Sequence, residues 1–512
     1  MSTHPGHLVA QATFEGPDVA WFALSPLLVL VGAGLGLLLL GALTPTWPRG
    51  LYAWVTVATA IAAGALAMAN WDDITDGTTS TLVDGALAFD TFAMFVTIAV
   101  CVALIGVALI TSDHLRRLGL DGPEHYGLFL IAGAGGVVMG AANDLIVLFL
   151  GLETLSLSFY VLAASNRRKA KSQESGMKYF ILGGFSSAFF LYGIAMIYGA
   201  TGTTNISKMV AAFDNTIPID RNEAFLLAGV ALLIVGFGFK VAAAPFHVWT
   251  PDVYEGAPTP ITALMASVGK IGAFAALLRV LVVGLGYYRD DWRPVIWVLA
   301  IVSLVVGSVL AVVQSNVKRM LAYSSISHAG FMLVGLEAAG HHAGEADSGA
   351  GVPAVLVYLI AYAVLVVGTF GVVALVARRG DDKTDLDSFR GLGRRHPALA
   401  LALTVFLVAQ AGVPFTSGFI AKFGVISAAV DEESYALALI AMLASVIAAF
   451  LYLRIMVSAW IQDAPDDDGE EAVTVPFRTG LAIASAAAFT LVVGIVPGWL
   501  LDAADVTIAF AR

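Results

Sequence analysis

Long apolar runs separated by short polar stretches cover almost the whole chain. A helix needs roughly 20 consecutive apolar residues to cross a bilayer, and the runs found here predict fourteen spanning helices. Their expected ranges are 22–44, 51–70, 88–111, 126–142, 145–164, 178–200, 223–244, 259–284, 294–313, 319–338, 354–377, 397–430 (interrupted), 434–461 and 478–501. The division within 126–164 depends on a single polar turn, Asn143-Asp144. The predicted fold class is therefore an all-α integral membrane protein.

The composition agrees with this interpretation and excludes several functions. Of the 512 residues, 59% are hydrophobic and 13% are charged, whereas soluble proteins carry about 25% charged residues. The formal charge of −11, without a basic patch, argues against nucleic-acid binding. The lone cysteine, Cys101, allows no disulfide within the chain, and no cysteine–histidine spacing predicts a metal or iron–sulfur site. Without a glycine-rich nucleotide fingerprint, the chain is expected to bind neither NADH nor flavin.

Lysine and arginine are unevenly divided between the connections. Those after odd-numbered helices carry 16, whereas the even-numbered ones and the termini carry 5. Since basic residues accumulate on the cytoplasmic side, both termini are expected outside. The acidic loop from Asp463 to Glu471 falls on the cytoplasmic side, although acidic residues contribute little to this rule. The alanine- and valine-rich, lysine-poor composition is typical of GC-rich bacterial coding, which favours a bacterial plasma membrane.

Six basic residues remain inside the predicted spans: Lys178, Lys240, Lys270, Arg279, Lys422 and Arg454. A charge at the bilayer centre costs roughly 2.5–3.5 kcal/mol on insertion scales, and such residues usually face a protein interior or an aqueous path. Lys270 lies about 16 Å from either end of its helix, too deep to reach the interface. Glu153 is equally enclosed by apolar residues. Both are therefore candidates for proton transfer, while Arg279 and Arg454 are expected to tie helices together.

Lys178 and His328 each have two interpretations, whereas His341 and His342 have one. Lys178 lies near the cytoplasmic end of its helix, where it could reach the interface or take part in proton transfer. His328 lies near the middle of the tenth span and could be a hydrogen-bonded core residue or a relay, because imidazole titrates near neutral pH. His341 and His342 lie in a polar outer loop, where no chemical role is expected.

Lys240 and Lys422 each accompany a predicted break in a helix. The chain stays apolar through Ala244-Pro245-Phe246, and the run 397–430 is interrupted at Gly412-Val413-Pro414. Proline breaks a helix, and a broken helix within a membrane is tolerated only where it is buried in protein or lines a wet cavity. The breaks fall in the seventh and twelfth spans, five helices apart. Because five is odd, a repeated unit would be inverted in the membrane, as in transporter folds.

The first break carries a specific signature. Residues 240–260 read KVAAAPFHVWTPDVYEGAPTP, which closely resembles the signature of the antiporter-like subunits of respiratory complex I and of Mrp-type cation/proton antiporters. The resemblance covers the chain from about residue 126 to 460. It implies fourteen helices with two inverted five-helix repeats and discontinuous helices 7 and 12. The expected divisions are an N-terminal three-helix segment (1–125), the first repeat (126–284), the second repeat (285–461), and a C-terminal loop and helix (462–512).

Two segments and one lysine are similar to the N-type member of that family. The segments are LGLETLSL at 150–157 and GMKYFILG at 176–183. Lys422 stands where the M-type carries a glutamate, and the chain stops after its fourteenth predicted span, without the lateral helix of the L-type. The resemblance thus implies a membrane-arm subunit of a proton-pumping NADH:quinone oxidoreductase.

The resemblance also implies a role for each candidate residue. Glu153 and Lys240 would form a buried acid–lysine pair, Lys270 the central relay, His328 the bridge between the halves, and Lys422 the outlet of the second half-channel; Lys178 joins them as a further relay candidate. A small shift of the broken helix would separate the pair and send the proton towards Lys270. Such pairs titrate as coupled sites.

Redox chemistry would then lie in other chains. Flavin, iron–sulfur clusters and quinone are expected in partner subunits, with no cofactor or metal in this one, and the implied neighbours are M-type and K-type membrane subunits. Two alternatives remain. The first is a Na⁺ (or K⁺)/H⁺ antiporter subunit of the Mrp type, which would use the same channel residues. The second is a non-transporting structural subunit, in which Lys240, Lys270 and Lys422 could become methionine or leucine without loss of turnover.

Overall fold

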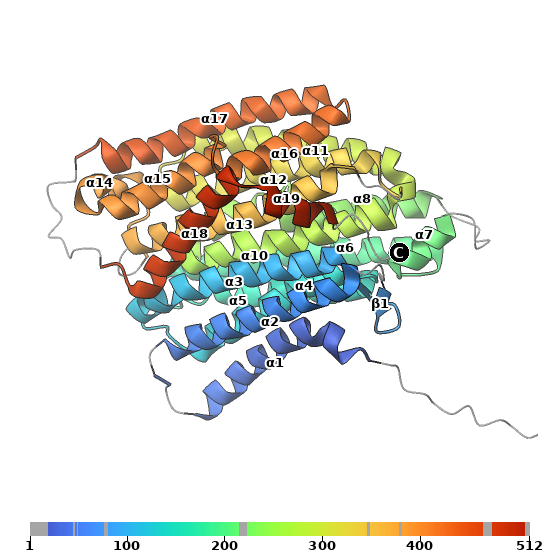
Figure 1. Cartoon of the computed structure of the whole chain (residues 1–512), viewed down its shortest axis with the longest axis horizontal. Coiled ribbons are helices and arrows are strands. Elements are labelled where there is room, and N and C mark those ends of the chain that lie inside the picture. Colours follow the sequence, from blue (N-terminus) through green and yellow to red (C-terminus); the bar gives the residue numbers. More distant parts are fainter. Residues whose placement is uncertain are drawn as a thin grey trace, which may run out of the picture.

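The computed structural model describes residues 19–44, 47–48, 50–75, 80–213, 223–345, 349–377, 381–463 and 474–506. Long helices run side by side along the longest axis of the molecule (Figure 1). They are α1 (Trp21–Leu43), α2 (Leu51–Thr75), α3 (Thr91–Leu118), α4 (Pro123–Ala141), α5 (Leu145–Ala163), α6 (Ala170–Thr201), α8 (Glu223–Val241), α10 (Thr259–Leu278), α11 (Arg289–Val312), α12 (Val317–His341), α13 (Gly351–Val376), α15 (Pro397–Ala411), α16 (Ser417–Asp431), α17 (Tyr435–Trp460) and α18 (Phe477–Ile495).

Shorter elements connect or extend these helices. They are the hairpin β1 (Ser80–Leu82) and β2 (Leu87–Phe89), the helices α7 (Ile206–Phe213), α9 (Trp249–Gly256), α14 (Leu392–Arg395) and α19 (Gly498–Asp505), a π-helix at Arg279–Gly284, and 3₁₀ turns at Gly286–Tyr288 and Leu386–Phe389. β1 pairs antiparallel with β2, with Ser80 opposite Phe89. The hairpin and α7 lie at one end of the bundle and α14 at the other (Figure 1).

Each predicted range contains a helix or a pair of helices, and the predicted all-α membrane class is confirmed. In the described part of the chain, 11 helices are long and apolar enough to cross a membrane. α4, α12 and the pair α15–α16 are not among the eleven, so the count of fourteen spans stays a prediction. The predicted division at Asn143-Asp144 is confirmed, because α4 ends at Ala141 and the Asp144 carboxylate accepts from the backbone N–H of Ile146 at 2.8 Å.

Several predicted boundaries were wrong: α6 begins at Ala170 rather than at 178, α11 begins at Arg289 rather than at 294, and α3 ends at Leu118 rather than at 111. The third helix begins at Thr91 rather than at 88, because the preceding residues pair in the hairpin and Asp90 caps the helix by accepting from the Ala93 N–H at 2.8 Å. The last predicted span, 478–501, is divided between α18 and α19 at Val496-Pro497. Proline cannot continue the helical hydrogen-bond ladder.

Several residues on which the predicted orientation depends are not among those that the structure describes. Arg49, Arg221, Arg378, Arg379 and Arg512, most of the acidic loop 463–471 and both ends of the chain lie outside the described residues. Lys318, which was counted as a loop residue, is instead buried in the first turn of α12. The placement of both termini outside therefore stays a prediction.

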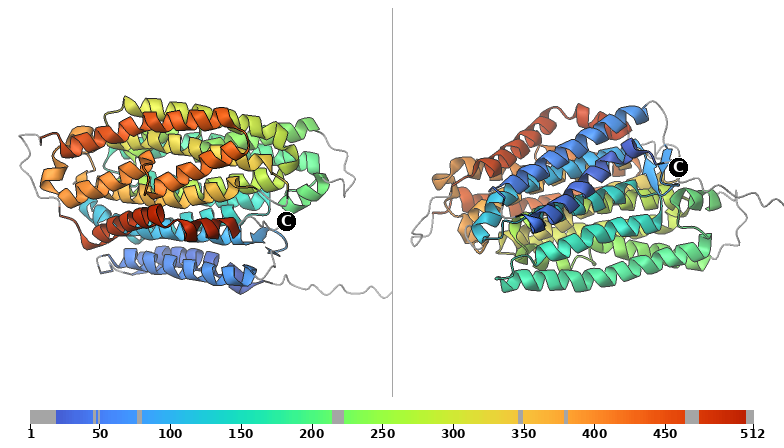
Figure 2. Two further views of the ribbon diagram at one scale, coloured as in Figure 1. Left: turned by 45° about the horizontal axis from the view of Figure 1, so that its top comes forward. Right: turned by 90° about the horizontal axis from the view of Figure 1, so that it is seen from below.

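α10 and α13 form the centre of the bundle. Every residue of α10 is buried, as is every residue of α13 except Ala354. α1 and α2 lie along one edge and α17 along the opposite edge, which the turned view also shows (Figures 1 and 2). Lys270, at the middle of α10, is thus enclosed by protein on all sides.

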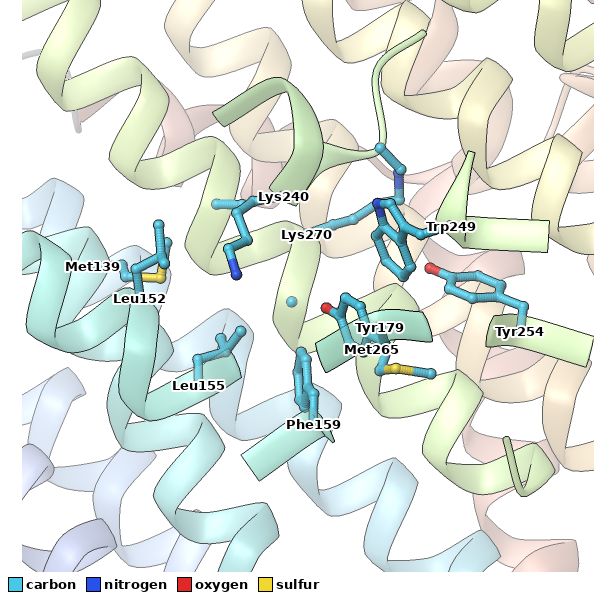
Figure 3. A pocket seen from close by; sticks show the side chains of 13 residues that line it. Met139, Leu152, Leu155, Phe159, Tyr179, Lys240, Trp249, Tyr254, Met265 and Lys270 are labelled. Carbon is cyan, nitrogen blue, oxygen red and sulfur yellow. The ribbon is translucent and has the colours of Figure 1, made fainter. Parts of the chain in front are cut away.

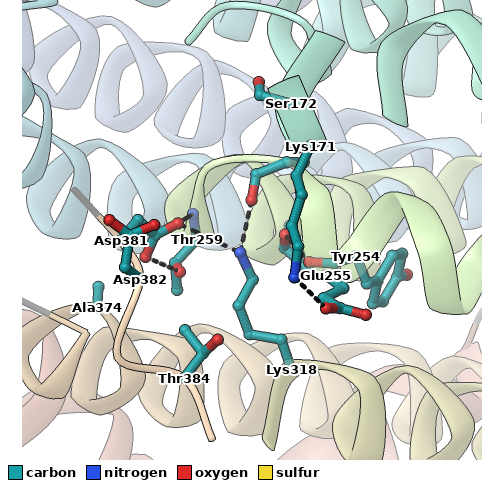
Figure 4. Close-up of polar contacts among 12 residues, drawn as sticks. Lys171, Ser172, Tyr254, Glu255, Thr259, Lys318, Ala374, Asp381, Asp382 and Thr384 are labelled. Atoms are coloured by element: carbon teal, nitrogen blue, oxygen red, sulfur yellow. Dashed lines mark hydrogen bonds and ion pairs between the residues drawn. The ribbon is translucent and has the colours of Figure 1, made fainter. Parts of the chain in front are cut away.

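Ion pairs at both ends hold α10 in place. At its start, Asp381 accepts from the Thr259 backbone N–H at 3.0 Å and hydroxyl at 2.6 Å, and pairs with Lys318 at 3.2 Å (Figure 4). Burial alone would raise the pKa of the Asp381 carboxyl, but Lys318 and the other groups around it hold that pKa well below its usual range. Just past its end, Arg279 binds both carboxylate oxygens of Asp90 at 2.9 Å, which confirms the expected tie.

Candidate functional site

The first helix break lies between α8 and α9. α8 ends at Val241, the next residue, Ala242, has a left-handed φ of 59°, and α9 begins at Trp249, beyond Pro245. Lys240 lies in the last turn of α8 and is buried. Its Nζ donates to the Ser156 hydroxyl at 2.6 Å and to the Tyr160 hydroxyl at 3.3 Å, both on α5. Two hydroxyl groups on α5 therefore bind the Lys240 ammonium at the break.

Lys270 reaches the same break from α10. Its Nζ donates to the Val241 carbonyl at 2.9 Å and to the Ser325 carbonyl at 2.9 Å. Val241 is the last residue of α8, and the carbonyls at a helix C-terminus carry partial negative charge and lack partners within the helix. Lys270 therefore caps the interrupted helix and connects it with α12.

Lys240 and Lys270 line one small cavity (Figure 3). It offers about 10 Å³ to the centre of a water molecule, which is close to the space of a single water. Tyr179, Trp249 and Tyr254 line its opposite side from Leu152 and Met139 in the view of Figure 3. The rings of Tyr179 and Trp249 stack with centroids 4.4 Å apart. The site can thus hold one water beside the two lysine side chains, behind an aromatic wall.

Glu153 does not contact Lys240 directly. In the described part of the chain no ion pair joins the two; the Glu153 carboxylate instead accepts from the Ser187 hydroxyl on α6. Glu153 is half-buried at a lateral face of α5, between the exposed Leu150 and Leu157. Ser156 lies one helical turn after Glu153 and is fully buried. Its hydroxyl, rather than the Glu153 carboxylate, therefore lies next to the Lys240 ammonium. Glu153 and Lys240 thus each bind a serine hydroxyl instead of each other.

The second break lies between α15 and α16, and Lys422 occupies it. α15 ends at Ala411, followed by Gly412 with a left-handed φ of 90°. The Lys422 Nζ donates to the Ala411 carbonyl at 3.1 Å and to the Ser445 hydroxyl at 2.8 Å. It also lies 4.6 Å from the ring centroid of Phe331 on α12. The predicted interruption is therefore present, and a buried lysine caps the helix that ends there.

His328 lies on α12 between the two lysine groups. Its Nδ1 is 2.6 Å from the Tyr358 hydroxyl and its Nε2 is 3.1 Å from the Tyr452 hydroxyl. The Tyr452 hydroxyl is also 2.6 Å from the Ser324 hydroxyl. Both ring nitrogens are thus engaged by phenols, which can donate or accept as the tautomer requires.

Lys178 lies apart from the buried lysines. Its side chain is 42% exposed and pairs with Glu174 and Asp252, each at 2.7 Å. These groups line an open hollow of about 210 Å³, together with Lys171, Ser175, Glu255, Gly256 and Arg319. α9 separates this hollow from the cavity, because Asp252 lines the hollow while Trp249 and Tyr254 line the cavity.

Sequence reasoning missed the hydroxyl partners of the site. Ser156 stands three residues after Glu153 and could have been found as its neighbour one helical turn away. Tyr358 and Tyr452 lie on α13 and α17, and nothing in the local sequence connects them with His328. In the described part of the chain, no group of three or more histidine, cysteine or acidic side chains is placed to hold a metal.

Comparison with known proteins gives matches over nearly the whole chain. The family model "NADH:quinone oxidoreductase/Mrp antiporter, TM" matches residues 142–448. The chain is 40% identical to NADH-quinone oxidoreductase subunit N of Trichlorobacter lovleyi, covering 94% of this chain and 95% of the relative. It is 39% identical to subunit N of Rhodococcus opacus, covering 100% of both. Among solved structures, a chain of respiratory complex I from Thermus thermophilus is 30% identical with a TM-score of 0.76, covering 93% of this chain and 98% of that one.

Proposed function

This chain belongs to the family of NADH-quinone oxidoreductase N subunits, within the NADH:quinone oxidoreductase/Mrp antiporter transmembrane family, and we propose that it conducts protons through the membrane arm of such an enzyme. In this proposal, the buried lysines carry the protons and NADH is oxidised in other subunits. The translocase activity belongs to the assembled enzyme, and this chain contributes the path.

The observation that supports this proposal is the way α12 joins the two broken helices. Three α12 residues spaced one turn apart, Ser325, His328 and Phe331, face Lys270, the two phenols and Lys422 in that order. Residues three apart on a helix are neighbours on its surface. Successive turns of α12 thus lie between Lys270 and Lys422, with His328 and its two phenols in the middle.

The path begins at Lys240. A water in the cavity between Lys240 and Lys270 would accept a proton from one amine and pass it to the other. A change in the charge of Lys270 also changes the strength of its hydrogen bond to the Val241 carbonyl. Proton transfer therefore alters the capping of α8 at the break. His328 then takes the proton at one ring nitrogen and releases it at the other towards Lys422. Glu153 acts on Lys240 through its charge rather than through a direct ion pair.

The energies involved are of matching size. Moving one proton against about 150 mV takes about 3.5 kcal/mol, scaled from the cost per elementary charge in a transmembrane potential. Hydrogen bonds to charged groups contribute about 1.5–3 kcal/mol each, and Lys240, Lys270 and Lys422 each make two. A conformational change that breaks both hydrogen bonds of one buried lysine would therefore be large enough to drive one proton step.

We further propose the surroundings of the subunit. Flavin, iron–sulfur clusters and quinone are placed in partner chains, M-type and K-type subunits are the neighbours, and the membrane is the bacterial plasma membrane. With both termini outside, the hollow around Asp252 faces the cytoplasm and supplies protons, so Lys178 acts at the mouth rather than in the buried path. The inverted repeats 126–284 and 285–461 would each contain one of the two breaks.

Replacing Lys240 with methionine tests the proposal. The change keeps most of the length of the side chain and removes the amine. In membrane vesicles with the fully assembled enzyme, checked on a native gel, NADH-driven proton pumping should fall to background and NADH oxidation should slow with it. Lys208→Met, an exposed lysine on α7, is the matched control and should pump normally. Normal pumping by assembled Lys240→Met enzyme would refute the proposed path.

A further inference from the structure

Two neighbouring histidines at the end of α12 each lie between two carboxylates. His341 Nε2 is 3.3 Å from Glu337, and its Nδ1 is 3.6 Å from Glu432. His342 Nε2 is 2.8 Å from the other oxygen of Glu432, and its Nδ1 is 3.2 Å from Glu345. The order is therefore Glu337, His341, Glu432, His342, Glu345, which we call the carboxylate–imidazole chain.

This arrangement differs from an ordinary surface ion-pair cluster in using both nitrogens of each ring. A histidine held by one carboxylate can store a proton, but a histidine between two can accept it at one nitrogen and release it at the other. Three of the four contacts lie within or close to hydrogen-bond distance, and the fourth, from His341 to Glu432, is only slightly longer. A small rotation of the His341 ring would bring its Nδ1 within hydrogen-bond distance of Glu432.

Within the carboxylate–imidazole chain, exposure is lowest at Glu337 and highest at Glu345. The Glu337 side chain is 4% exposed, His341 23%, Glu432 20%, His342 36% and Glu345 48%. The Ser434 hydroxyl donates to Glu337 at 2.9 Å, and Arg293 lies 3.8 Å from the same carboxylate. At the exposed end, Arg289 pairs with Glu345 at 2.7 Å. The carboxylate–imidazole chain thus connects an enclosed carboxylate with bulk water.

Its position in the fold relates it to the buried lysines. α12 begins beside the hollow, where Arg319 pairs with Asp252 at 2.7 Å, and ends at Glu337 and His341. Glu337 lies nine residues beyond His328, about 13.5 Å along the helix. Glu432 directly follows α16, the helix that carries Lys422. α12, which carries His328, and α16, which carries Lys422, therefore both end at this site. The site lies at the opposite end of the molecule from the hollow.

A dry seam separates the lysines from the carboxylate–imidazole chain. At Gly335 an added Cβ would lie 2.7 Å from a Val355 methyl and 2.9 Å from a Val425 methyl. α12, α13 and α16 are therefore packed closely there, with no room for water. A proton can pass from Lys422 to Glu337 only when the seam admits water, and closing the seam would then prevent its return.

We propose that the carboxylate–imidazole chain is the site through which the second half-channel exchanges protons with the aqueous phase; this rests on the proposed function. Protonated Glu337 gives its proton to Nε2 of His341, which releases its Nδ1 proton to Glu432. Glu432 gives it to Nε2 of His342, which releases its Nδ1 proton to Glu345 and thence to water. Each ring ends in the opposite tautomer and is reset by a ring flip. No bond other than those to protons changes.

Glu337→Gln provides the first test, since glutamine keeps the shape and cannot carry the proton. In vesicles with assembled enzyme, the initial rate of NADH-driven pumping should fall about tenfold or more, in line with the loss of a proton-transfer group. Ser434→Ala removes a hydrogen bond from the same carboxylate without removing a titratable group, and it should change the rate less than about twofold. A purely structural cluster predicts similar losses in both variants.

Chemical rescue provides the second test and applies even where Glu337→Gln fails to assemble. His342→Ala should slow pumping severalfold, and imidazole trapped inside the vesicles should restore most of it, because the site is open to water. Assembled Glu337→Gln that pumps at the wild-type rate, or His342→Ala that imidazole does not rescue, would overturn the inference. Lys240→Met distinguishes the failures: if it abolishes pumping while Glu337→Gln does not, only the carboxylate–imidazole chain is wrong.

Discussion

The two helix breaks share a proline pattern but use their lysines differently. In the first, Lys240 binds the hydroxyls of Ser156 and Tyr160, while a second lysine, Lys270, caps the Val241 carbonyl. In the second break, Lys422 alone binds both a hydroxyl and the terminal carbonyl of its helix. The first break therefore divides storage of the proton and capping of the helix between two amines, so a proton held on Lys240 leaves the cap unchanged until it passes to Lys270. In the second break, movement of a proton must also change the cap.

The largest expected effect compares Lys422→Met with Lys240→Met. Both should reduce pumping about a hundredfold, as expected for loss of a proton-transfer group. Only Lys422→Met also removes a charged donor from a helix end, which should lower the free energy of unfolding by about 1–3 kcal/mol. Thermal denaturation of the purified assembled enzyme measures this difference. Equal melting temperatures for the two variants would contradict the comparison.

The hydroxyl partners should matter more in the first break than in the second. Ser156→Ala leaves Lys240 with only the 3.3 Å contact to Tyr160, whereas Ser445→Ala leaves Lys422 on the Ala411 carbonyl. We expect pumping to fall about tenfold in the first variant and about threefold in the second, since hydrogen bonds to charged groups contribute about 1.5–3 kcal/mol. Ser158→Ala, a buried serine on the same helix, is the control. The reverse order would show that Ser156 does not hold the amine.

The left-handed residues of the two breaks give a smaller, purely structural contrast. Gly412 suits its φ of 90°, whereas Ala242 adopts 59° with a side chain. Gly412→Ala should cost about 1–2 kcal/mol from the backbone alone, and its Cβ would lie 2.9 Å from Lys422 Cδ. Ala242→Gly should stabilise slightly or have no effect. Thermal denaturation of the assembled enzyme checks both, and a fully stable Gly412→Ala variant would count against this account of the second break.

The two ends of α12 should differ in their response to pH. Asp381 has a pKa held well below its usual range, so its stabilising contribution is complete at any pH above 3.8 and is lost only in acid. Burial lowers the pKa of His342, but hydrogen bonds to Glu345 and Glu432 outweigh it and raise that pKa overall. The His342 contacts therefore stabilise fully below pH 6.5 and weaken as the pH rises through the raised pKa. Hydrogen exchange, corrected for its intrinsic pH dependence, should show loosening near 342 and not near 381 between pH 6 and 8.

Much of the fold could be predicted from the sequence, because apolar runs and proline breaks are local signals. Both interrupted helices follow from Pro245 and Pro414 with the apolar residues around them. The hairpin at 80–89 was missed, since its two strands of three residues are too short to show a clear alternation. Buried Lys270 was recognisable from its depth within one helix.

The site was less predictable, because its contacts join distant helices. The direct contact of Glu153 with Lys240 is absent from the described structure, since the rotation of α5 presents Ser156 to the amine instead. His341 and His342 looked like inert loop residues because Glu432, which joins them, lies 90 residues further along the chain. Such pairings depend on helix packing, which periodicity alone does not determine.

The most direct test of the central claim is NADH-driven proton pumping by assembled enzyme carrying Lys270→Met. Lys270 is the residue that links the first break to α12, so every proton that crosses between the halves must pass it. The account predicts that pumping falls to background and that NADH oxidation slows with it, while Lys208→Met in parallel vesicles remains normal. Wild-type pumping by assembled Lys270→Met enzyme would contradict the account and favour a structural role for the buried lysines.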